Sequence, residues 1–188
     1  MKTVKKVIAV TMSMLAAMAM SQMSVFAQEK STASAGRSET SCRNATRLTQ
    51  AALAGNWELV ATEVVLPDGH AEQDYGEAPK GQLMIDAAGR YSLQIYQSGR
   101  PRFAAGDKRK GTAEEYAAAT RGASTHFGRI EIDAKAGQLR FSIDNALFPN
   151  WIGQQQERRY EWCAPELRYY GKPRPDGGVP VSVWRRAE

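Results

Sequence analysis

The sequence is poor in the residue types that build metal and nucleophilic sites, with 2 cysteines and 2 histidines among its 188 residues. A zinc site takes three or four ligands at close spacing, but Cys42, Cys163, His70 and His126 lie far apart along the chain. No serine or cysteine stands with a histidine at a spacing that is diagnostic of nucleophilic catalysis. We therefore predict no metal and no cofactor, and we assign no catalytic residue.

A long apolar run is also missing after residue 27, so nothing in that part of the chain predicts a membrane-spanning helix. Before that point, three lysines precede an apolar run from Val7 to Met20, and the segment ends at Ala27. The run has 14 residues, fewer than the ~20 that cross a bilayer. This layout is typical of a secretory signal peptide over residues 1–27. We expect a periplasmic or secreted product with no transmembrane segment after cleavage.

The excess of basic charge largely disappears with that segment. The full chain has 25 basic and 20 acidic residues, and loss of the three lysines in residues 1–27 leaves 22 against 20, a net charge of +2. The basic cluster from Lys108 to Lys110 lies between Gly106 and Gly111 without interleaved aromatic residues, which is typical of a solvated loop. The sequence thus predicts no nucleic-acid partner.

The two cysteines leave two alternatives open. Disulfides persist in exported proteins, and a Cys42–Cys163 bridge would tie the N-terminal segment to a late strand. In the alternative, both thiols are unpaired. Residues 28–47 are rich in serine, threonine, alanine and charge without an apolar period, so we expect a flexible segment there. The folded domain is expected over residues 48–188.

This domain alternates short strand-like runs with turns, which indicates an all-β fold. Tyr91 and Leu93 alternate with polar residues, as in a strand with one buried face. Residues 112–115 form a capping box at the start of one short helix that ends near Gly122. The eight predicted strands are 56–66, 81–85, 90–97, 126–133, 138–144, 155–162, 167–170 and 179–186. Their short connections favour an eight-stranded up-and-down antiparallel barrel with one short helix over a Greek-key sandwich.

The first and last predicted strands carry the residues expected to close the barrel. Gly55 and Trp57 begin the first strand, and Arg185 and Arg186 end the last. Pairing of these two strands removes both edges of the sheet. The guanidinium of Arg185 or Arg186 can stack on the indole of Trp57, so all four residues are predicted to be structural.

Five segments share a pattern across the domain. They are Gly55 to Leu59, Tyr75 to Gly81, Arg100 to Phe103, Glu114 to Tyr116, and Phe148 to Gly153 followed by Arg158. Together they resemble the bacterial and fungal lipocalin-like domain family of the calycin superfamily, and the resemblance spans nearly the whole domain. It implies a lipocalin-like barrel that holds a small molecule.

The sequence departs from that family's pattern in two places. Many relatives have histidine in the strand that here holds Phe141 and Ser142, and tyrosine at the position of His126. The resemblance also implies that some proteins of this fold are isomerases or cyclases that act on a molecule held in the barrel. An activity that depends on those histidines is not expected here.

Two segments carry candidate site residues. Pro149 interrupts the strand ladder and predicts a corner, where Trp151 either lines a ligand at the barrel mouth or plugs the barrel end. Arg158 follows in the next strand. An inward-facing arginine needs an anionic partner, which is either a ligand or one of the carboxylates of Asp144 and Glu131.

We interpret the chain as an exported binding module that holds a small apolar or amphipathic molecule with a polar or anionic group. Two alternatives stay open. One is an enzyme of the isomerase or cyclase type, for which His126 is the candidate base unless it is a packed strand residue. The other is a barrel filled by its own side chains. The predicted ligand-binding residues are Tyr91, Arg100, Phe127, Phe141, Trp151, Arg158 and Tyr160.

Overall fold

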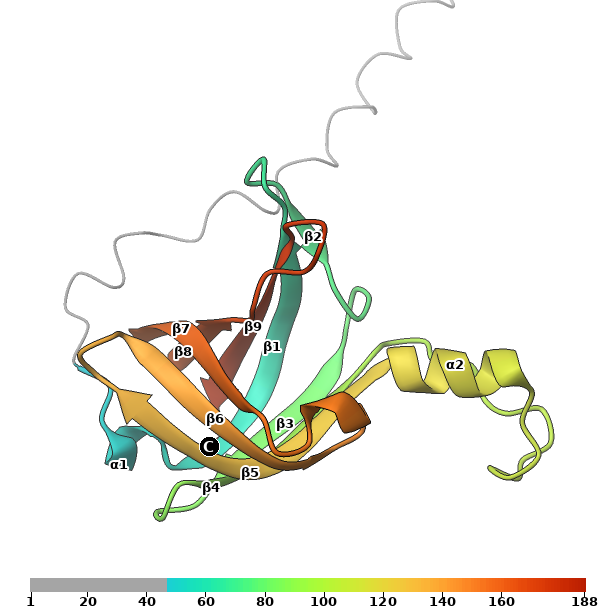
Figure 1. Ribbon diagram of the computed structural model, residues 1–188, viewed down its shortest axis with the longest axis horizontal. Helices are drawn as coiled ribbons and strands as arrows, with labels where there is room; N and C mark the ends of the chain where they lie inside the picture. The colour runs from blue at the N-terminus through green and yellow to red at the C-terminus, as the bar shows by residue number, and fades with distance from the viewer. Residues whose placement is uncertain (1–46) are drawn as a thin grey trace, which may run out of the picture. The chain divides into compact units, whose positions relative to one another are not determined.

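Eight strands close an antiparallel barrel in chain order, which confirms the predicted up-and-down topology (Figure 1). The computed structural model describes residues 47–188. Each strand pairs with the next one around the circuit, and β1 pairs with β9 to complete it. The strands of the circuit are β1 (Gly55–Val65), β3 (Lys80–Ile85), β4 (Arg90–Tyr96), β5 (Ala123–Asp133), β6 (Gln138–Ala146), β7 (Gln155–Cys163), β8 (Glu166–Tyr170) and β9 (Val179–Arg186).

The N-terminal part of the chain is not covered by this description. The predicted signal peptide over residues 1–27 and most of the predicted flexible segment over residues 28–47 lie outside the described residues. Both therefore stay predictions.

A short additional strand lies outside the circuit. β2 (Ala71–Gln73) pairs with the end of β1, from Glu63 to Val65. The sequence predicts a loop at this position. All three residues of β2 are exposed, so the strand has no buried face and no apolar alternation that could reveal it.

The predicted helix is α2 (Ala113–Arg121), and it begins with the predicted capping box. The Glu115 N–H donates to Thr112 Oγ1 at 3.2 Å, and the Thr112 N–H donates to the Glu115 carboxylate at 2.8 Å. None of the residues of α2 is buried, and Figure 1 shows the helix projecting from the barrel wall. Neither α2 nor another helix within residues 47–188 is long and apolar enough to cross a bilayer.

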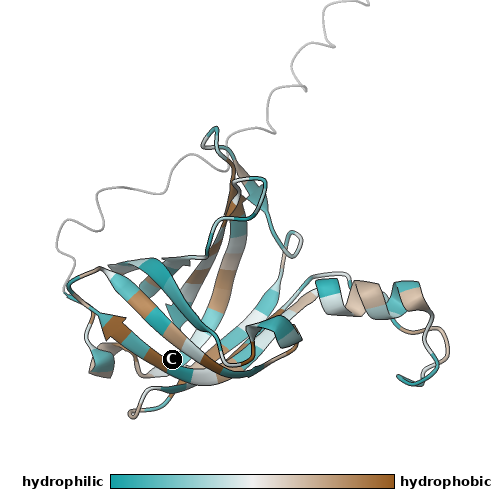
Figure 2. Cartoon of the chain, viewed as in Figure 1, coloured by the Kyte–Doolittle hydropathy of each residue, from teal (hydrophilic) through white to brown (hydrophobic). Residues whose placement is uncertain are grey.

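Alternation along the strands separates a dry interior from a wet outer face, visible in Figure 2 as alternating hydrophobic and hydrophilic bands. On β4, Tyr91, Leu93 and Ile95 are buried between more exposed neighbours. Trp57 and Phe141 are among the largest fully buried side chains. Because the interior is mostly apolar, each polar side chain inside it must have a partner or a function.

One end of the barrel is closed by the single-turn helix α1 (Gln50–Leu53). Leu53 is fully buried, and its carbonyl oxygen accepts a hydrogen bond from Trp57 Nε1 at 2.9 Å. Gln50 Nε2 donates to the carbonyl oxygen of Ile130 at 3.3 Å, which fastens the helix to β5. The opposite end of the barrel is open to a cavity.

The β1–β9 seam contains the predicted stacking of an arginine on Trp57, and the arginine is Arg186. Its guanidinium carbon lies 4.6 Å from the centre of the Trp57 ring, and its Nη atoms donate to two backbone carbonyls in residues 52–54. Glycine suits position 55 because its φ of 135° is one that L side chains rarely adopt, and a Cβ there would also displace Arg186 Nη1. Arg185 is exposed instead and lies 3.9 Å from a carboxylate of β8.

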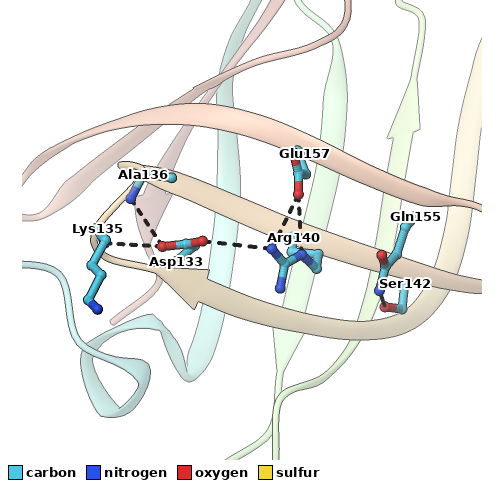
Figure 3. A network of polar contacts seen from close by, with 7 residues as sticks. All are labelled: Asp133, Lys135, Ala136, Arg140, Ser142, Gln155 and Glu157. Atoms are coloured by element: carbon cyan, nitrogen blue, oxygen red, sulfur yellow. Dashed lines mark hydrogen bonds and ion pairs between the residues drawn. The ribbon is translucent and has the colours of Figure 1, made fainter.

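The outer face of β5, β6 and β7 carries a polar network (Figure 3). Arg140 Nη2 lies 3.2 Å from the Glu157 carboxylate and 3.7 Å from that of Asp133. Asp133 also accepts from the backbone N–H groups of residues 135 and 136 in the β5–β6 turn. Exposed ion pairs of this kind add little stability, but they show that this outward arginine has carboxylate partners.

Candidate ligand-binding cavity

A cavity of about 1120 Å³ opens at the end of the barrel opposite α1. Inward residues of β4, β5, β7, β8 and β9 form its wall. The 3₁₀ turn η1 (Pro149–Trp151) and the loop after β8 contribute to its mouth. The volume lies slightly above the ~300–1,000 Å³ that small-molecule sites usually occupy. Its polar and aromatic lining includes Tyr75, His126, Trp151, Gln156, Arg158 and Tyr169, together with the charged residues Asp74, Glu157, Arg159, Lys172 and Arg174.

Arg158 places a positive charge on the inner wall. Its guanidinium carbon lies 4.2 Å from the centre of the Phe141 ring and 5.1 Å from that of Tyr169. Its Nη2 atom donates to Gln156 Oε1 at 2.7 Å, and Gln156 is a neutral partner. Within residues 47–188, Arg158 forms no ion pair with a carboxylate. A half-buried arginine with neutral neighbours is suited to bind an anion.

The two carboxylates that the sequence offers as internal partners of Arg158 are both exposed. On β6, Ile143 is buried, so the next residue, Asp144, faces outward. On β5, Ile130 is buried, so Glu131 faces outward as well. Of the two alternatives for the partner of Arg158, the internal ion pair is therefore wrong. Both carboxylates stand at strand positions whose side chains point out of the barrel.

His126 is buried between Arg158 and Tyr91. Tyr91 Oη lies 2.7 Å from Nδ1 of the imidazole, and Arg158 Nη2 lies 3.5 Å from Nε2. A guanidinium can only donate, so Nε2 accepts and Nδ1 carries the proton in this arrangement. Burial, and after it the Arg158 charge, lowers the pKa of His126 from 6.5 to about 3. Near neutral pH, His126 is therefore an uncharged residue that positions its neighbours.

Tyr169 brings an unused hydrogen-bond donor to the cavity wall. The residue is 2 % exposed, and its ring stacks on Trp184 with 6.3 Å between centres. By hydrogen-bond geometry, neither the Tyr169 hydroxyl nor Trp184 Nε1 has a partner in the described part of the chain. Burial raises the pKa of the Tyr169 phenol, although Arg158, Trp184 and Ser182 lie close enough to lower that pKa in part, so the group stays protonated. A buried donor without an acceptor costs ~1–3 kcal/mol, which a ligand acceptor would recover.

Trp151 stands at the mouth, in the corner that Pro149 predicts. The residue is half-buried and lines the cavity. Its ring centre lies 5.8 Å from that of His126 and 5.6 Å from that of Phe148. Trp151 therefore borders an open cavity, and its predicted contact with a ligand stays a prediction.

Phe127 and Arg100 lie outside the interior, which corrects the prediction that both line it. Consecutive strand residues face opposite sides. Since His126 faces inward, Phe127 faces outward and has 51 % of its surface exposed. Arg100 is an exposed residue of the loop after β4, where its guanidinium carbon lies 4.5 Å from the centre of the Tyr96 ring.

The other predicted ligand residues lie behind the cavity wall. Tyr91 and Phe141 are buried, and their rings meet edge to face at 5.1 Å. They support the imidazole of His126 and the guanidinium of Arg158 from below. Tyr160 is half-buried against the apolar core rather than in the cavity lining.

Among the cavity residues that sequence reasoning missed are Tyr75, Gln156 and Tyr169. For two of them the signal is strand parity, because Gln156 is two residues before Arg158 and Tyr169 is two residues after the buried Leu167. Tyr75 stands in the segment from Tyr75 to Gly81 that carries the family resemblance. Its φ of 57° is rare for a bulky residue, and strained backbone of this kind is common in binding sites.

The predicted Cys42–Cys163 bridge stays a prediction. Cys163 is the last residue of β7, whereas Cys42 lies outside the described residues. Among residues 47–188 there is no group of three or more histidine, cysteine, aspartate or glutamate side chains that could hold a metal ion.

Comparison with known proteins identifies one family. The sequence profile described as the lipocalin-like domain matches residues 54–186. A crystal structure of a mutant of the fluorescent protein UnaG is similar at 14 % sequence identity, over 71 % of this chain and 95 % of that chain, with a TM-score of 0.33. A likeness this distant supports no functional statement. The comparison with curated proteins finds no match.

Proposed function

The chain belongs to the lipocalin-like domain family, and from this premise we propose that its barrel binds a small, mostly apolar molecule with one anionic group. One observation carries the proposal. Arg158 lies on the wall of a cavity of about 1120 Å³, and no carboxylate within residues 47–188 pairs with it. A ligand anion would supply the missing partner.

The surroundings of Arg158 indicate how such a ligand would be oriented. Its anionic group would accept hydrogen bonds from the Arg158 guanidinium and from the Tyr169 hydroxyl. The guanidinium carbon lies 5.1 Å from the centre of the Tyr169 ring. His126, neutral and fixed by Tyr91, would hold the guanidinium without competing for the anion. The apolar part of the ligand would pack on Leu93 and Ile95, which also line the cavity.

The first prediction concerns the replacement of Arg158 by leucine. We expect the parent protein to melt at a higher temperature with at least one member of a panel of fatty and aromatic acids. A ligand at about 100 times its Kd stabilises the folded state by ~2.7 kcal/mol. Arg158→Leu should lose this response. Without ligand it should be about as stable as the parent, since the change leaves no buried carboxylate unpaired and removes an unpaired charge, while Gln156 Oε1 and His126 Nε2 lose their donor.

Arg140→Leu is the matched control, because Arg140 is an outward-facing arginine on the neighbouring strand. This variant should keep the full response to the acids. A parent that no acid stabilises, together with an Arg158→Leu variant that is several kcal/mol less stable, would mean that Arg158 is a structural residue.

We further propose that the protein works in an exported compartment and carries the Cys42–Cys163 bridge there. The proposal is supported by the lysines and the short apolar run before Ala27 and by the compartments in which disulfides persist. Mass mapping of unreduced protein from the exported fraction should find an N-terminus at Gln28 and the two cysteine peptides joined. Complete alkylation of both thiols without a reductant would exclude the bridge.

A further inference from the structure

Three large apolar side chains remain exposed around the cavity mouth. Leu147, Phe148 and Ile152 flank the η1 turn and expose 40 %, 47 % and 47 % of their surface. We call these three residues the mouth rim. The Phe148 ring packs on Trp151, which lines the cavity, so the rim borders the opening itself. Exposed apolar side chains grouped in this way mark an interaction surface.

A basic segment borders the mouth rim. Residues 97–122 are joined to the barrel beside it, because the Gln97 N–H donates to the carbonyl of Gly122 and the Leu147 N–H donates to that of Thr125. Figure 1 shows α2, which belongs to this segment, projecting from the barrel before the start of β5. None of the residues of α2 is buried by another part of residues 47–188.

The charges of the basic segment are unbalanced. Its basic residues are Arg100, Arg102, Lys108, Arg109, Lys110 and Arg121, and its acidic residues are Asp107, Glu114 and Glu115. Asp107 pairs with Arg109, and the Glu115 carboxylate accepts from two backbone N–H groups. Within residues 47–188, Arg102, Lys108, Lys110 and Arg121 form no ion pair. Positive charge therefore gathers beside the apolar rim.

We propose that the mouth rim and the basic segment dock onto a lipid bilayer that carries anionic headgroups. Apolar side chains that enter the interface, combined with lysine and arginine that meet anionic lipid, are the two components of reversible membrane binding. A stable protein partner would need about 800 Å² from this chain. Three partly exposed side chains provide only a fraction of that area. The docking does not depend on the proposed ligand, but it would turn the cavity mouth toward the hydrocarbon.

The test is co-sedimentation with vesicles, on protein whose N-terminus has been determined so that parent and variants carry the same N-terminal residues. The parent should bind mixed phosphatidylcholine–phosphatidylglycerol vesicles more tightly than phosphatidylcholine alone, and added salt should weaken the binding. The double variant Phe148→Ser/Ile152→Ser should bind the mixed vesicles at least about tenfold more weakly, given the apolar area that it removes.

Two matched controls distinguish binding through the proposed surface from non-specific binding through other exposed apolar or basic side chains. Met84 and Phe127 are exposed to a similar degree, 39 % and 51 %, but they lie on the barrel wall, so Met84→Ser/Phe127→Ser should bind like the parent. Lys108→Glu, a change of two units of charge, should weaken binding to mixed vesicles about thirtyfold, following ~1 kcal/mol per unit of charge at an anionic surface. Lys135→Glu, in the β5–β6 turn, should cost nothing.

Several outcomes would overturn the proposal. A folded parent that does not bind the mixed vesicles is one, and equal binding by the parent and the rim variant is another. Dimerisation of the parent in light scattering that the rim variant abolishes, without vesicle binding, would assign the rim to a second copy of the chain instead.

Discussion

Replacing Trp57 by alanine should lower the free energy of unfolding by ~3–5 kcal/mol, the usual cost of removing a buried tryptophan. The side chain is fully buried, meets the Trp162 ring edge to face at 5.8 Å and carries the Arg186 guanidinium on its face. Its loss would also leave the Leu53 carbonyl without its donor. Because whole domains are stable by only ~5–15 kcal/mol, chemical denaturation should show a large shift of the midpoint.

Phe127→Ala is the control for this measurement. It removes an aromatic ring that is half exposed on the outer wall, so its effect should stay within ~0.5–1 kcal/mol. A Trp57→Ala midpoint as close to the parent's as that of the control would show that the seam does not depend on the indole.

Acid should destabilise the fold through His126, and this is the second large effect that we expect. The pKa of His126 is lowered to about 3 in the folded protein, chiefly by burial, whereas the unfolded chain takes up the proton near pH 6.5. Between these values only the unfolded state is protonated, so the stability is complete above pH 6.5 and falls with decreasing pH. From pH 7 to pH 4, this group should cost about 3 kcal/mol.

Urea unfolding of the parent and of His126→Gln at both pH values isolates this contribution. The variant loses the imidazole contacts and should be less stable at pH 7, but its stability should change less on acidification. His70 and the carboxylates are the same in both proteins, so their titration cancels in the comparison. Equal losses for parent and variant would mean that His126 titrates normally in the folded protein.

Strand parity and turn residues are enough to predict most of the fold. The alternation of Tyr91, Leu93 and Ile95 predicts β4, and the capping box of Thr112 and Glu115 predicts the start of α2. Both are local signals that the tertiary structure reinforces. β2 has no such signal, because an exposed strand of three residues needs only backbone pairing with β1.

The site is less predictable because it depends on how residues that are far apart in the sequence fill and charge the interior of the barrel. Parity beside the buried residues Ile130 and Ile143 places Glu131 and Asp144 outside, but that no other carboxylate reaches Arg158 depends on the positions of all the strands around the cavity. The open cavity likewise depends on the total volume of the side chains at each end of the barrel. Large rings such as Trp57 and Trp162 gather near α1, and smaller residues such as Ser124 and Val181 line the other end. No local pattern in the sequence reports that distribution.

The β1–β9 seam has a consequence for how the chain must fold. The hydrogen bond from Arg186 to Ala54 joins residues 132 positions apart, so the barrel cannot close until the last strand has been synthesised. Pairings of such long sequence separation form slowly. Until then, β1 presents an unpaired edge beside the exposed ring of Trp57, and such edges recruit strands of other chains. A chain truncated before β9 would therefore end as an open sheet that aggregates, and not as a smaller barrel.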